Sequence, residues 1–388
     1  MILKSIKDIK NLKGKRVILR LDLNIYLKNN KVLKDSIWRL EKVLSTIKYL
    51  SNKKAKVIII AHLGRPKGKD SNLSLLPLSK YLSKLIKKEI EFWSSDFKEY
   101  YEDSLILDNG QIVMLENIRF YEREIMNSKR FAKSLSKLGD LYVNDAFAVI
   151  HREHSSVLAI TEYLPSYAGL LIQEEINILE KITKRKKGLV AIFGGAKVKT
   201  KIKLLKRFIN ISDYILLGGV LANTMLQAQG YNMQGSIIEK DSIILAKKLM
   251  NKKIILPLDF SVAKSLKSKK YKVVDVENIP KNESALDIGL KTVKEYTKIL
   301  KKANLIIWNG PLGYFENTNF TKGSKSLANV IIKFKIKTII GGGETVYLIT
   351  KNKLRDKFYF VSTGGGAMLA FLEGSKLPAL EKLKKYAR

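Results

Sequence analysis

Side chains able to bind an anion stand at the end of an apolar segment near residue 60. The run I-I-I-A (58–61) is followed directly by His62, Gly64, Arg65 and Pro66. An arginine offers planar, bidentate hydrogen bonds that match phosphate and carboxylate groups. Glycine and proline restrict the turn that carries the two ligand-binding side chains. The pattern predicts a buried strand that delivers His62 and Arg65 to an anion.

The same arrangement recurs through the first half of the chain. Polar and basic residues follow further apolar segments, at Arg20, Asp22 and Asn24, at Arg119, and at Asp145, His151 and Arg152. Only 12 of the 72 basic residues are arginine, and eight of these lie between Arg16 and Arg152. One such arginine could be a surface ion pair, but several at one edge of a sheet favour a site for a compact polyanion.

The second half of the chain places glycines where its apolar segments end. They are Gly194-Gly195, Gly218-Gly219, Gly310, Gly341-Gly342-Gly343 and Gly364-Gly365-Gly366. Glycine lets the backbone approach a ligand, and the N–H groups at the start of a helix favour phosphate. A single glycine turn could serve packing alone, whereas several in one half favour a nucleotide site.

Two lysines lie beside one of these turns, in F-G-G-A-K-V-K-T-K-I (193–202). Lys197 and Lys201 are spaced i and i+4, so a helix beginning here would carry both on one face. Two cations beside a glycine turn suit stabilisation of a phosphoryl group in transfer. In a lysine-rich chain they could equally be two solvated side chains, and the spacing alone leaves both interpretations open.

Several classes of site are disfavoured. The chain has no cysteine, which excludes disulfides, thiolate metal sites and cysteine nucleophiles. There is no G-x-x-x-x-G-K-[ST], no G-x-G-x-x-G and no recognisable Ser-His-Asp pattern. A metal site formed by His62, His151 and His154 is an alternative that no carboxylate pattern supports. Phosphoryl transfer, which needs positioning and positive charge more than a nucleophilic side chain, is compatible with this inventory.

Strand-length apolar runs alternate with helical patterns throughout the 388 residues. Strand candidates are 16–22, 56–61, 112–115, 141–144, 188–193, 214–217, 253–256, 271–274, 304–308, 337–340 and 358–361, and helical patterns include 36–50, 73–86, 128–138 and 170–182. Continuous apolar strands between helices are typical of parallel sheets covered on both faces. We therefore expect an α/β fold with two parallel units joined near helix 170–182.

The net charge of +36 admits two explanations. Lysines are scattered through the predicted helices rather than gathered in one arm, which favours compositional drift over a nucleic-acid-binding surface. No secretory signal and no run of about 18 apolar residues is readable, so we expect a cytoplasmic protein that does not span a membrane.

Taken in order, the motifs resemble those of the phosphoglycerate kinase family over essentially the whole chain. They are R-L-D-L-N (20–24), H-L-G-R-P-K-G (62–68), L-E-N-I-R-F (115–120), N-D-A-F (144–147), H-R-E-H-S-S (151–156), G-G-A-K-V (194–198), W-N-G-P-L-G-Y-F-E (308–316), G-G-G-E-T (341–345) and S-T-G-G-G-A (362–367). The resemblance implies reversible phosphoryl transfer from 1,3-bisphosphoglycerate to Mg-ADP, in glycolysis, by a monomer. It also implies two Rossmann-like domains, each a parallel sheet flanked by helices, that close around a hinge.

The resemblance also implies domains and residue roles. A phosphoglycerate-binding domain would span 1–169, a nucleotide-binding domain 170–367, and a C-terminal segment, 368–388, would return to the first domain. Substrate would be bound by Asp22, Asn24, Arg39, His62, Arg65, Arg119 and Arg152. The nucleotide would be bound by Gly195, Lys201, Gly219, Glu316, Gly342, Gly343, Glu344 and Thr345, with Mg²⁺ at Glu344. Transition-state charge would be stabilised by Arg39, Lys197, Gly343 and Gly366.

The sequence departs from the family pattern at several positions. Glu344 stands where the family usually has Asp, Tyr26 replaces a usual Pro, and Ala148-Val149 replaces a usual Gly-Thr. The residues before Arg39 are altered, and Ala370 stands where Glu is common. A non-catalytic member of the fold that binds polyanions is therefore the alternative. Retention of Arg39, Lys197 and the glycine turns favours an active enzyme.

Overall fold

The computed structural model describes residues 2–184, 187–196 and 198–384. The chain divides into two compact units, the first comprising Met1–Glu180 together with the segment from Gly374 on, and the second Lys181–Glu373. The division lies within α6 (Leu170–Thr183) and after α13 (Gly365–Glu373), rather than at residues 169 and 367. α13 remains with the second unit because it packs against α7 (Val198–Ile211).

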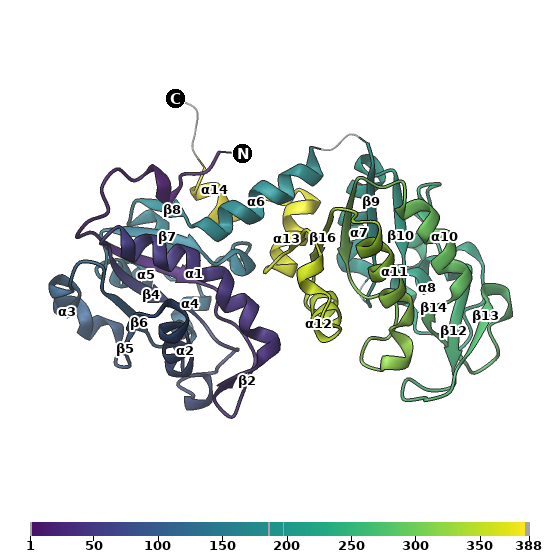
Figure 1. Ribbon diagram of the computed structural model, residues 1–388, viewed down its shortest axis with the longest axis horizontal. Helices are drawn as coiled ribbons and strands as arrows, with labels where there is room; N and C mark the ends of the chain where they lie inside the picture. Colours follow the sequence, from purple (N-terminus) through teal and green to yellow (C-terminus); the bar gives the residue numbers. More distant parts are fainter. Residues whose placement is uncertain (1, 185–186, 197, 385–388) are drawn as a thin grey trace. The chain divides into compact units, whose positions relative to one another are not determined.

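The first unit is built on a six-stranded parallel sheet (Figure 1). In order across the sheet, the strands are β5 (Glu91–Trp93), β6 (Ile112–Leu115), β4 (Lys56–Ile60), β1 (Arg16–Leu21), β7 (Leu141–Asp145) and β8 (Ser166–Ala168). Its helices are α1 (Ile37–Asn52), α2 (Leu76–Ile86), α3 (Tyr101–Ile106), α4 (Glu122–Ile125), α5 (Lys129–Ser136), most of α6, and α14 (Pro378–Lys382). A short hairpin joins β2 (Leu27–Lys28) to β3 (Lys31–Val32).

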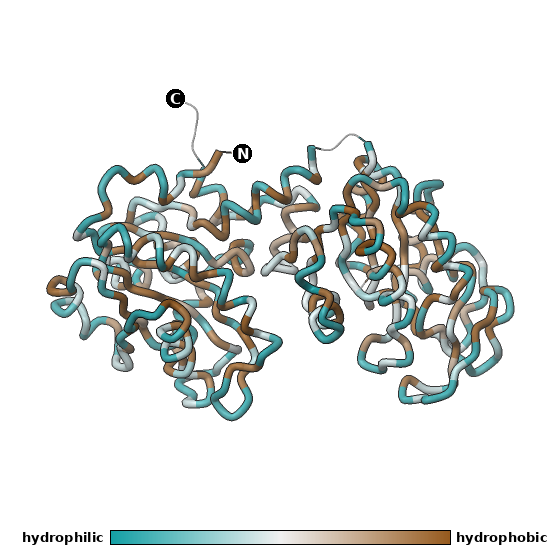
Figure 2. The backbone as a smooth tube through the Cα atoms, viewed as in Figure 1, coloured by the Kyte–Doolittle hydropathy of each residue, from teal (hydrophilic) through white to brown (hydrophobic). Residues whose placement is uncertain are grey.

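Successive side chains of these strands enter two separate hydrophobic cores. Val17 and Leu19 of β1 pack with Val43 and Ile47 of α1, on one face of the sheet. Ile18 packs with Phe131 and Leu135 of α5 on the other face. Because alternate residues point to opposite faces, a strand covered on both sides must be apolar throughout. Figure 2 shows this as hydrophobic stretches along the strands.

The second unit repeats the architecture and adds a smaller sheet. Its six parallel strands, in order, are β11 (Ile254–Ile255), β10 (Tyr214–Leu217), β9 (Leu189–Phe193), β15 (Leu305–Asn309), β16 (Thr338–Gly341) and β17 (Phe360–Val361). The helices besides α7 and α13 are α8 (Gly219–Gln229), α9 (Ile243–Lys248), α10 (Leu290–Leu300), α11 (Lys322–Lys333) and α12 (Gly343–Lys351). The two parallel sheets confirm the predicted fold class.

The smaller sheet corrects one expectation. It is antiparallel, with β12 (Asp259–Ala263) between β13 (Lys272–Asp275) and β14 (Ser284–Ile288). The strand expected at 271–274 therefore does not belong to the parallel sheet. β13 has exposed residues at Lys272 and Val273, as an edge strand in an antiparallel sheet can.

The chain from Gly374 on lies against the N-terminus. The Lys4 N–H donates to the Leu383 carbonyl at 2.7 Å, and Leu3 pairs with Lys384 in an antiparallel bridge. Both ends of the described chain are therefore held in the first unit. No helix in the described ranges is long and apolar enough to cross a membrane.

Asp145, at the end of β7, ties that strand to the start of α6. Its carboxylate accepts the N–H of Ile172 at 3.1 Å, while the Leu170 N–H donates to the Thr46 hydroxyl at 3.1 Å. Burial raises the pKa of Asp145 to about 7. The side chain at the carboxyl end of β7 is thus used to cap a helix.

We expect Asp145→Ala to lower the free energy of unfolding by about 1–2 kcal/mol, because the first turn of α6 loses its capping acceptor. Urea unfolding followed by circular dichroism would measure the change. Asp241→Ala, at an exposed carboxylate, is the control and should have little effect. An unchanged midpoint for Asp145→Ala would contradict the capping role.

Candidate functional site

The carboxyl ends of four neighbouring strands in the first unit carry the predicted anion-binding side chains. Arg20 is the penultimate residue of β1, His62 follows β4, Arg119 follows β6 and Arg152 follows β7. These strands are parallel and adjacent, so their carboxyl ends lie along one edge of the sheet. The structure thereby brings together residues that are far apart in the sequence.

The turn after His62 is held from both sides. The Gly64 N–H donates to the side-chain oxygen of Asn24 at 2.9 Å, and the Gly64 carbonyl accepts from Nη1 of Arg119 at 2.7 Å. Gly64 has φ of +64°, and a Cβ there would lie 2.8 Å from the Leu73 side chain. Glycine is therefore required both by the left-handed backbone and by the close approach of Leu73.

Asp22 and Arg39 approach each other beside this turn. Their closest atoms, Oδ2 and Nη1, are 3.9 Å apart. Asp22 is buried and also accepts the Asn24 N–H at 3.3 Å, whereas Arg39 is partly exposed. The Arg39 guanidinium lies 5.5 Å from the centre of the Trp38 ring. The altered residue before Arg39 thus supplies a buried aromatic support.

Arg20, Arg65, Arg119 and Arg152 form a cation cluster. Burial and mutual repulsion weaken the charged forms of several groups in and beside it. Burial, followed by the neighbouring Arg20, Arg119 and Arg152, holds the pKa of His62 well below its ordinary value. Burial and the charges of Arg152, Arg20 and Arg65 lower the pKa of Arg119 to about 10. Since Asp22 and Glu124 offset only part of this charge, the cluster is a place where a bound anion would be stabilised.

A pocket of about 520 Å³ opens beside the cluster. It is lined by Arg65, Pro66, Lys67, Gly68, Arg119, Phe120, Glu122, Ile125, Arg152 and His154. Its cationic side chains come from three different loops, so the predicted residues Arg65, Arg119 and Arg152 share one concave surface. Each can donate several hydrogen bonds to an anion in the pocket.

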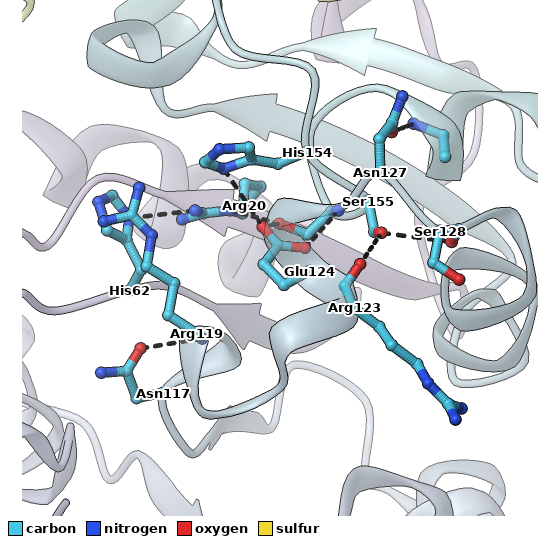
Figure 3. Close-up of polar contacts among 12 residues, drawn as sticks. Arg20, His62, Asn117, Arg119, Arg123, Glu124, Asn127, Ser128, His154 and Ser155 are labelled. Carbon is cyan, nitrogen blue, oxygen red and sulfur yellow. Dashed lines mark hydrogen bonds and ion pairs between the residues drawn. The ribbon is translucent and has the colours of Figure 1, made fainter. Parts of the chain in front are cut away.

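Behind the cluster lie polar residues that the sequence reasoning did not assign to it. Glu124 is fully buried in α4 and accepts a hydrogen bond from Ser156, which in turn accepts one from Arg20. Figure 3 shows Glu124 close to Arg20 and His154. His154 approaches the same carboxylate, with Nδ1 3.8 Å from Oε1. Burial and the nearby arginines lower the pKa of His154 to about 4, so this contact is not an ion pair at neutral pH. No sequence periodicity predicts that Glu124 and Ser156 meet, because they are 32 residues apart and come together only in the folded chain.

The glycine turns of the second unit converge by direct backbone packing. A Cβ on Gly194 would lie 1.9 Å from the Pro311 carbonyl oxygen, so no other residue fits. Gly195 and Gly219 are neighbours, since a Cβ on Gly219 would lie 3.0 Å from the Gly195 nitrogen. The Gly310 N–H donates to the Thr345 hydroxyl at 2.7 Å. These contacts join the carboxyl ends of β9, β10, β15 and β16.

Gly343, the first residue of α12, differs from the packed glycines. A Cβ there would meet no described atom within 4 Å, and its φ lies outside the left-handed region. A glycine in a helix costs about 1 kcal/mol relative to alanine. Since neither packing nor backbone conformation requires this glycine, the space that it leaves is available to a ligand.

Lys201 and Glu344 lie over the Gly195 turn. A Cβ on Gly195 would be 3.3 Å from Nζ of Lys201 and 3.6 Å from Oε2 of Glu344. Burial lowers the pKa of Lys201 to about 8, although the carboxylate of Glu344 opposes the change. The buried ammonium also donates to the Gly194 carbonyl. An ammonium and a carboxylate therefore flank one glycine turn.

The remaining nucleotide-site candidates lie as follows. Gly366 is in the first turn of α13. Gly365 is close to Gly342, since a Cβ added to Gly365 would lie 2.9 Å from the Gly342 Cα. Glu316 is exposed, and its neighbour Phe315 contacts the Tyr347 ring of α12 with centroids 6.0 Å apart. Lys197 lies outside the described residues.

Asn309, at the end of β15, is a further candidate that the sequence reasoning did not single out. Its Nδ2 is buried and, among the described atoms, has no hydrogen-bond partner. This atom would lie 2.8 Å from a Cβ on Gly342. An unsatisfied donor beside a glycine turn is available to an acceptor on a ligand.

The cation cluster should cost the first unit stability. We expect Arg152→Gln to raise the free energy of unfolding by about 0.5–1 kcal/mol, because one of several repelling charges is removed while most of the stem remains. Urea unfolding at low salt would measure this, with Arg130→Gln at an exposed position of α5 as the control. A lower stability of Arg152→Gln would show that attraction to Asp22 outweighs the repulsion.

Comparisons with known proteins agree over nearly the whole chain. The family model for phosphoglycerate kinase matches residues 6–375. A phosphoglycerate kinase of Borreliella afzelii is 40% identical over 395 residues, covering 99% of this chain and 100% of that protein, and one of Finegoldia magna is 41% identical over 392 residues, covering 97% and 98%.

Solved structures give the same result. That of phosphoglycerate kinase from Coxiella burnetii has a TM-score of 0.88 at 36% identity, and that from Pyrococcus horikoshii a TM-score of 0.85 at 30% identity. Each covers 98% of both chains. With its two parallel sheets, its cation cluster and its converging glycine turns, this chain belongs to the phosphoglycerate kinase family.

Proposed function

We propose that this protein is a phosphoglycerate kinase. It transfers a phosphoryl group from 1,3-bisphosphoglycerate to Mg-ADP, giving 3-phosphoglycerate and ATP, and it catalyses the reverse reaction. The observation that carries the proposal is the buried, incompletely neutralised cation cluster in the first unit of a chain of this family. A small molecule with a phosphate and a carboxylate matches the sign and spread of that charge.

The first unit binds the phosphoglycerate. Arg65, Arg119 and Arg152 hold its anionic groups in the pocket that they line. Asp22 and Asn24 bind its neutral glycerate portion, where Asp22 accepts hydrogen bonds and Asn24 can accept or donate them. The Asp22 carboxylate would repel the anionic groups of the ligand, so it is assigned to the neutral part. His62 is buried and neutral, so it serves as a hydrogen-bonding group rather than as a cation.

The second unit binds the nucleotide. Gly195, Gly219, Gly342 and Gly343 let backbone N–H groups approach the phosphates, and α12 begins at Gly343 with the positive end of its dipole. Lys201 and Asn309 add an ammonium and an amide donor beside these turns. Thr345 fixes the Gly310 turn, and the exposed Glu316 accepts hydrogen bonds from the ribose.

The donor set at Glu344 fits Mg²⁺ bound with a nucleotide. Mg²⁺ is bound in such sites by one or two carboxylates together with substrate phosphates and water. Glu344 provides one carboxylate, in the first turn of α12 and beside the glycine turns. When bound, the ion would neutralise charge on the nucleotide phosphates. The longer side chain of Glu, compared with the usual Asp, leaves this carboxylate exposed and able to adjust.

Transfer requires no nucleophilic side chain. The oxygen of ADP attacks the acyl phosphate, and the carboxylate of 3-phosphoglycerate leaves. Catalysis is the stabilisation of charge on the phosphoryl oxygens. We assign it to Arg39 and Lys197, and to the backbone N–H groups of Gly343 and Gly366. Direct transfer requires the two ligands to meet, and we propose that the protein acts as a cytoplasmic monomer whose two domains close around a hinge.

The proposed activity is tested by a coupled assay of ATP-dependent phosphorylation of 3-phosphoglycerate, with titration of Mg²⁺ and salt. We expect Mg²⁺-dependent turnover that Lys197→Ala reduces by a factor of about 10² or more, the usual effect of removing one group that stabilises a transition state. Lys199→Ala, at an exposed lysine of α7, is the matched control. A folded protein without turnover would favour the non-catalytic, polyanion-binding alternative, which no present observation supports.

Loss of one pocket cation should affect one substrate only. We expect Arg65→Ala to raise the KM for 3-phosphoglycerate by about tenfold or more, because a charge-assisted hydrogen bond is lost. The KM for ATP should stay the same. Steady-state kinetics with each substrate varied in turn would measure both, and an unchanged KM for 3-phosphoglycerate would remove Arg65 from the site.

Gly343 offers a test that separates stability from binding. We expect Gly343→Ala to leave the protein as stable or to stabilise it by about 0.5–1 kcal/mol, since alanine favours the helix and the space is open. Nucleotide affinity should fall, because the methyl group occupies the ligand's approach to the backbone. Urea unfolding and calorimetric titration with ADP would measure the two effects. Unchanged ADP affinity would show that the open space at Gly343 is not used.

A further inference from the structure

A buried carboxylate lies behind the cation cluster and has no part in the chemistry proposed above. Glu124 is 0% exposed, and Ser156 binds both of its oxygens. The Ser156 N–H donates to Oε2 at 2.8 Å, and the Ser156 hydroxyl donates to Oε1 at 2.6 Å. The main chain of Ser156 is itself anchored, since the Tyr142 hydroxyl donates to its carbonyl at 2.7 Å.

The direction of the hydrogen bonds in this network follows from chemistry. A guanidinium has donors only, so Nε of Arg20 must donate to the Ser156 hydroxyl oxygen, 2.9 Å away. The single hydroxyl hydrogen is then directed to Glu124. The chain of donors therefore runs from the Arg20 guanidinium through Ser156 to the carboxyl group of Glu124, so that two buried side chains are linked by one hydroxyl.

Because Arg20 has only donors, its contact with His62 determines which ring nitrogen carries the hydrogen. Nη2 of Arg20 lies 3.1 Å from Nδ1 of His62 (Figure 3). Because Arg20 can only donate, Nδ1 must be the acceptor and cannot carry a hydrogen. The imidazole is then neutral with its hydrogen on Nε2. The third Arg20 contact, from Nη1 to the Leu21 carbonyl at 2.5 Å, leaves the guanidinium no freedom to turn away.

We propose that Glu124 is a positioning residue which, through Ser156 and Arg20, holds His62 as a neutral imidazole with its hydrogen on Nε2. In this form His62 can donate one hydrogen bond to an anionic ligand without adding another positive charge to the cluster. The tautomer is a property of the free protein, whereas its use in binding rests on the proposed function.

The charges that face Glu124 agree with this arrangement. Arg20 and Arg119 favour its ionised form, although burial raises its pKa. The neighbouring His154 is neutral, because its own pKa is lowered to about 4, and the phenol of Tyr142 has a raised pKa and stays protonated. Glu124 is therefore the one carboxylate, among these described neighbours, that can offset Arg20. Burial and the arginines lower the pKa of His62, which also excludes the imidazolium at neutral pH.

The tautomer can be read directly from ¹⁵N shifts of the imidazole rings in the free, full-length protein at pH 7. The chain has three histidines, so single substitutions of His151 and His154 would assign the signals. We expect one protonated and one unprotonated ring nitrogen for His62, with Nδ1 unprotonated. A hydrogen on Nδ1, or an imidazolium, would overturn the proposal.

The role of Glu124 is tested by Glu124→Gln, whose amide offers one acceptor oxygen in place of two. The two His62 nitrogen shifts should move toward each other, because Ser156 loses part of its anchor, the Nε contact that orients Arg20 weakens, and both tautomers become populated. Ser156→Ala cuts the same link and should give the same result if Glu124→Gln does not fold. His62 shifts that match the wild type in a folded variant would overturn the assignment.

A matched control lies at the other end of the same strand. Asp140 binds Arg16, the first residue of β1, with Oδ1 2.7 Å from Nη2. Asp140→Asn also breaks a carboxylate–arginine pair, but it should leave the His62 shifts unchanged. A change in the His62 tautomer in Asp140→Asn would show a general effect of destabilisation and would contradict a specific role for Glu124.

Kinetics then separate this inference from the proposed function. We expect Glu124→Gln to raise the KM for 3-phosphoglycerate by about tenfold or more, with kcat and the KM for ATP much less affected. A large fall in kcat with unchanged KM would overturn the positioning role. A wild-type protein with the expected tautomer but no kinase activity would defeat the proposed function and leave the tautomer assignment intact.

Discussion

The first unit depends on one electrostatic constraint, which is the gathering of like charges where little water can screen them. Arg20 and Arg119 are buried, and Arg152 is half-buried beside them. Charges in such surroundings interact far more strongly than in water. The unit tolerates the repulsion because Glu124 offsets part of it and because its histidines remain neutral. A bound anion would offset more of this charge, so an arrangement that costs stability is one that we propose to give affinity.

In the second unit, backbone N–H groups rather than charged side chains are the main groups available to an anion. Its strand ends carry glycines packed so closely that Gly194 would place a Cβ 1.9 Å from a carbonyl oxygen. Only a few side chains, among them Lys201, Asn309 and Glu344, project beside the turns. A cradle of N–H groups suits phosphates and is insensitive to the lysine-rich drift of the sequence.

Features that depend on a local pattern of apolar and polar residues could be predicted from the sequence. The doubly covered strands near 58 and 190 read as apolar runs, and both are buried strands in the structure. The anion-binding role of the residues that follow the first of them stays a prediction. Three features depended on tertiary contacts and were missed. Glu124 and Ser156 come together only through the fold, Asp145 turns to cap α6, and the strand at Lys272–Asp275 joins an antiparallel sheet. Short strands such as β13 have no period that distinguishes the two kinds of sheet.

The most direct test of this account is the pKa of His154 measured by NMR titration with and without saturating 3-phosphoglycerate. In the free protein, burial and then the nearby arginines lower this pKa to about 4. The negative charge of bound 3-phosphoglycerate would offset the arginines and favour the imidazolium, so the pKa should rise with 3-phosphoglycerate and stay unchanged with Mg-ADP. A His154 pKa that does not respond to 3-phosphoglycerate, or that responds only to the nucleotide, would contradict the assignment of the cation cluster to the phosphorylated acid.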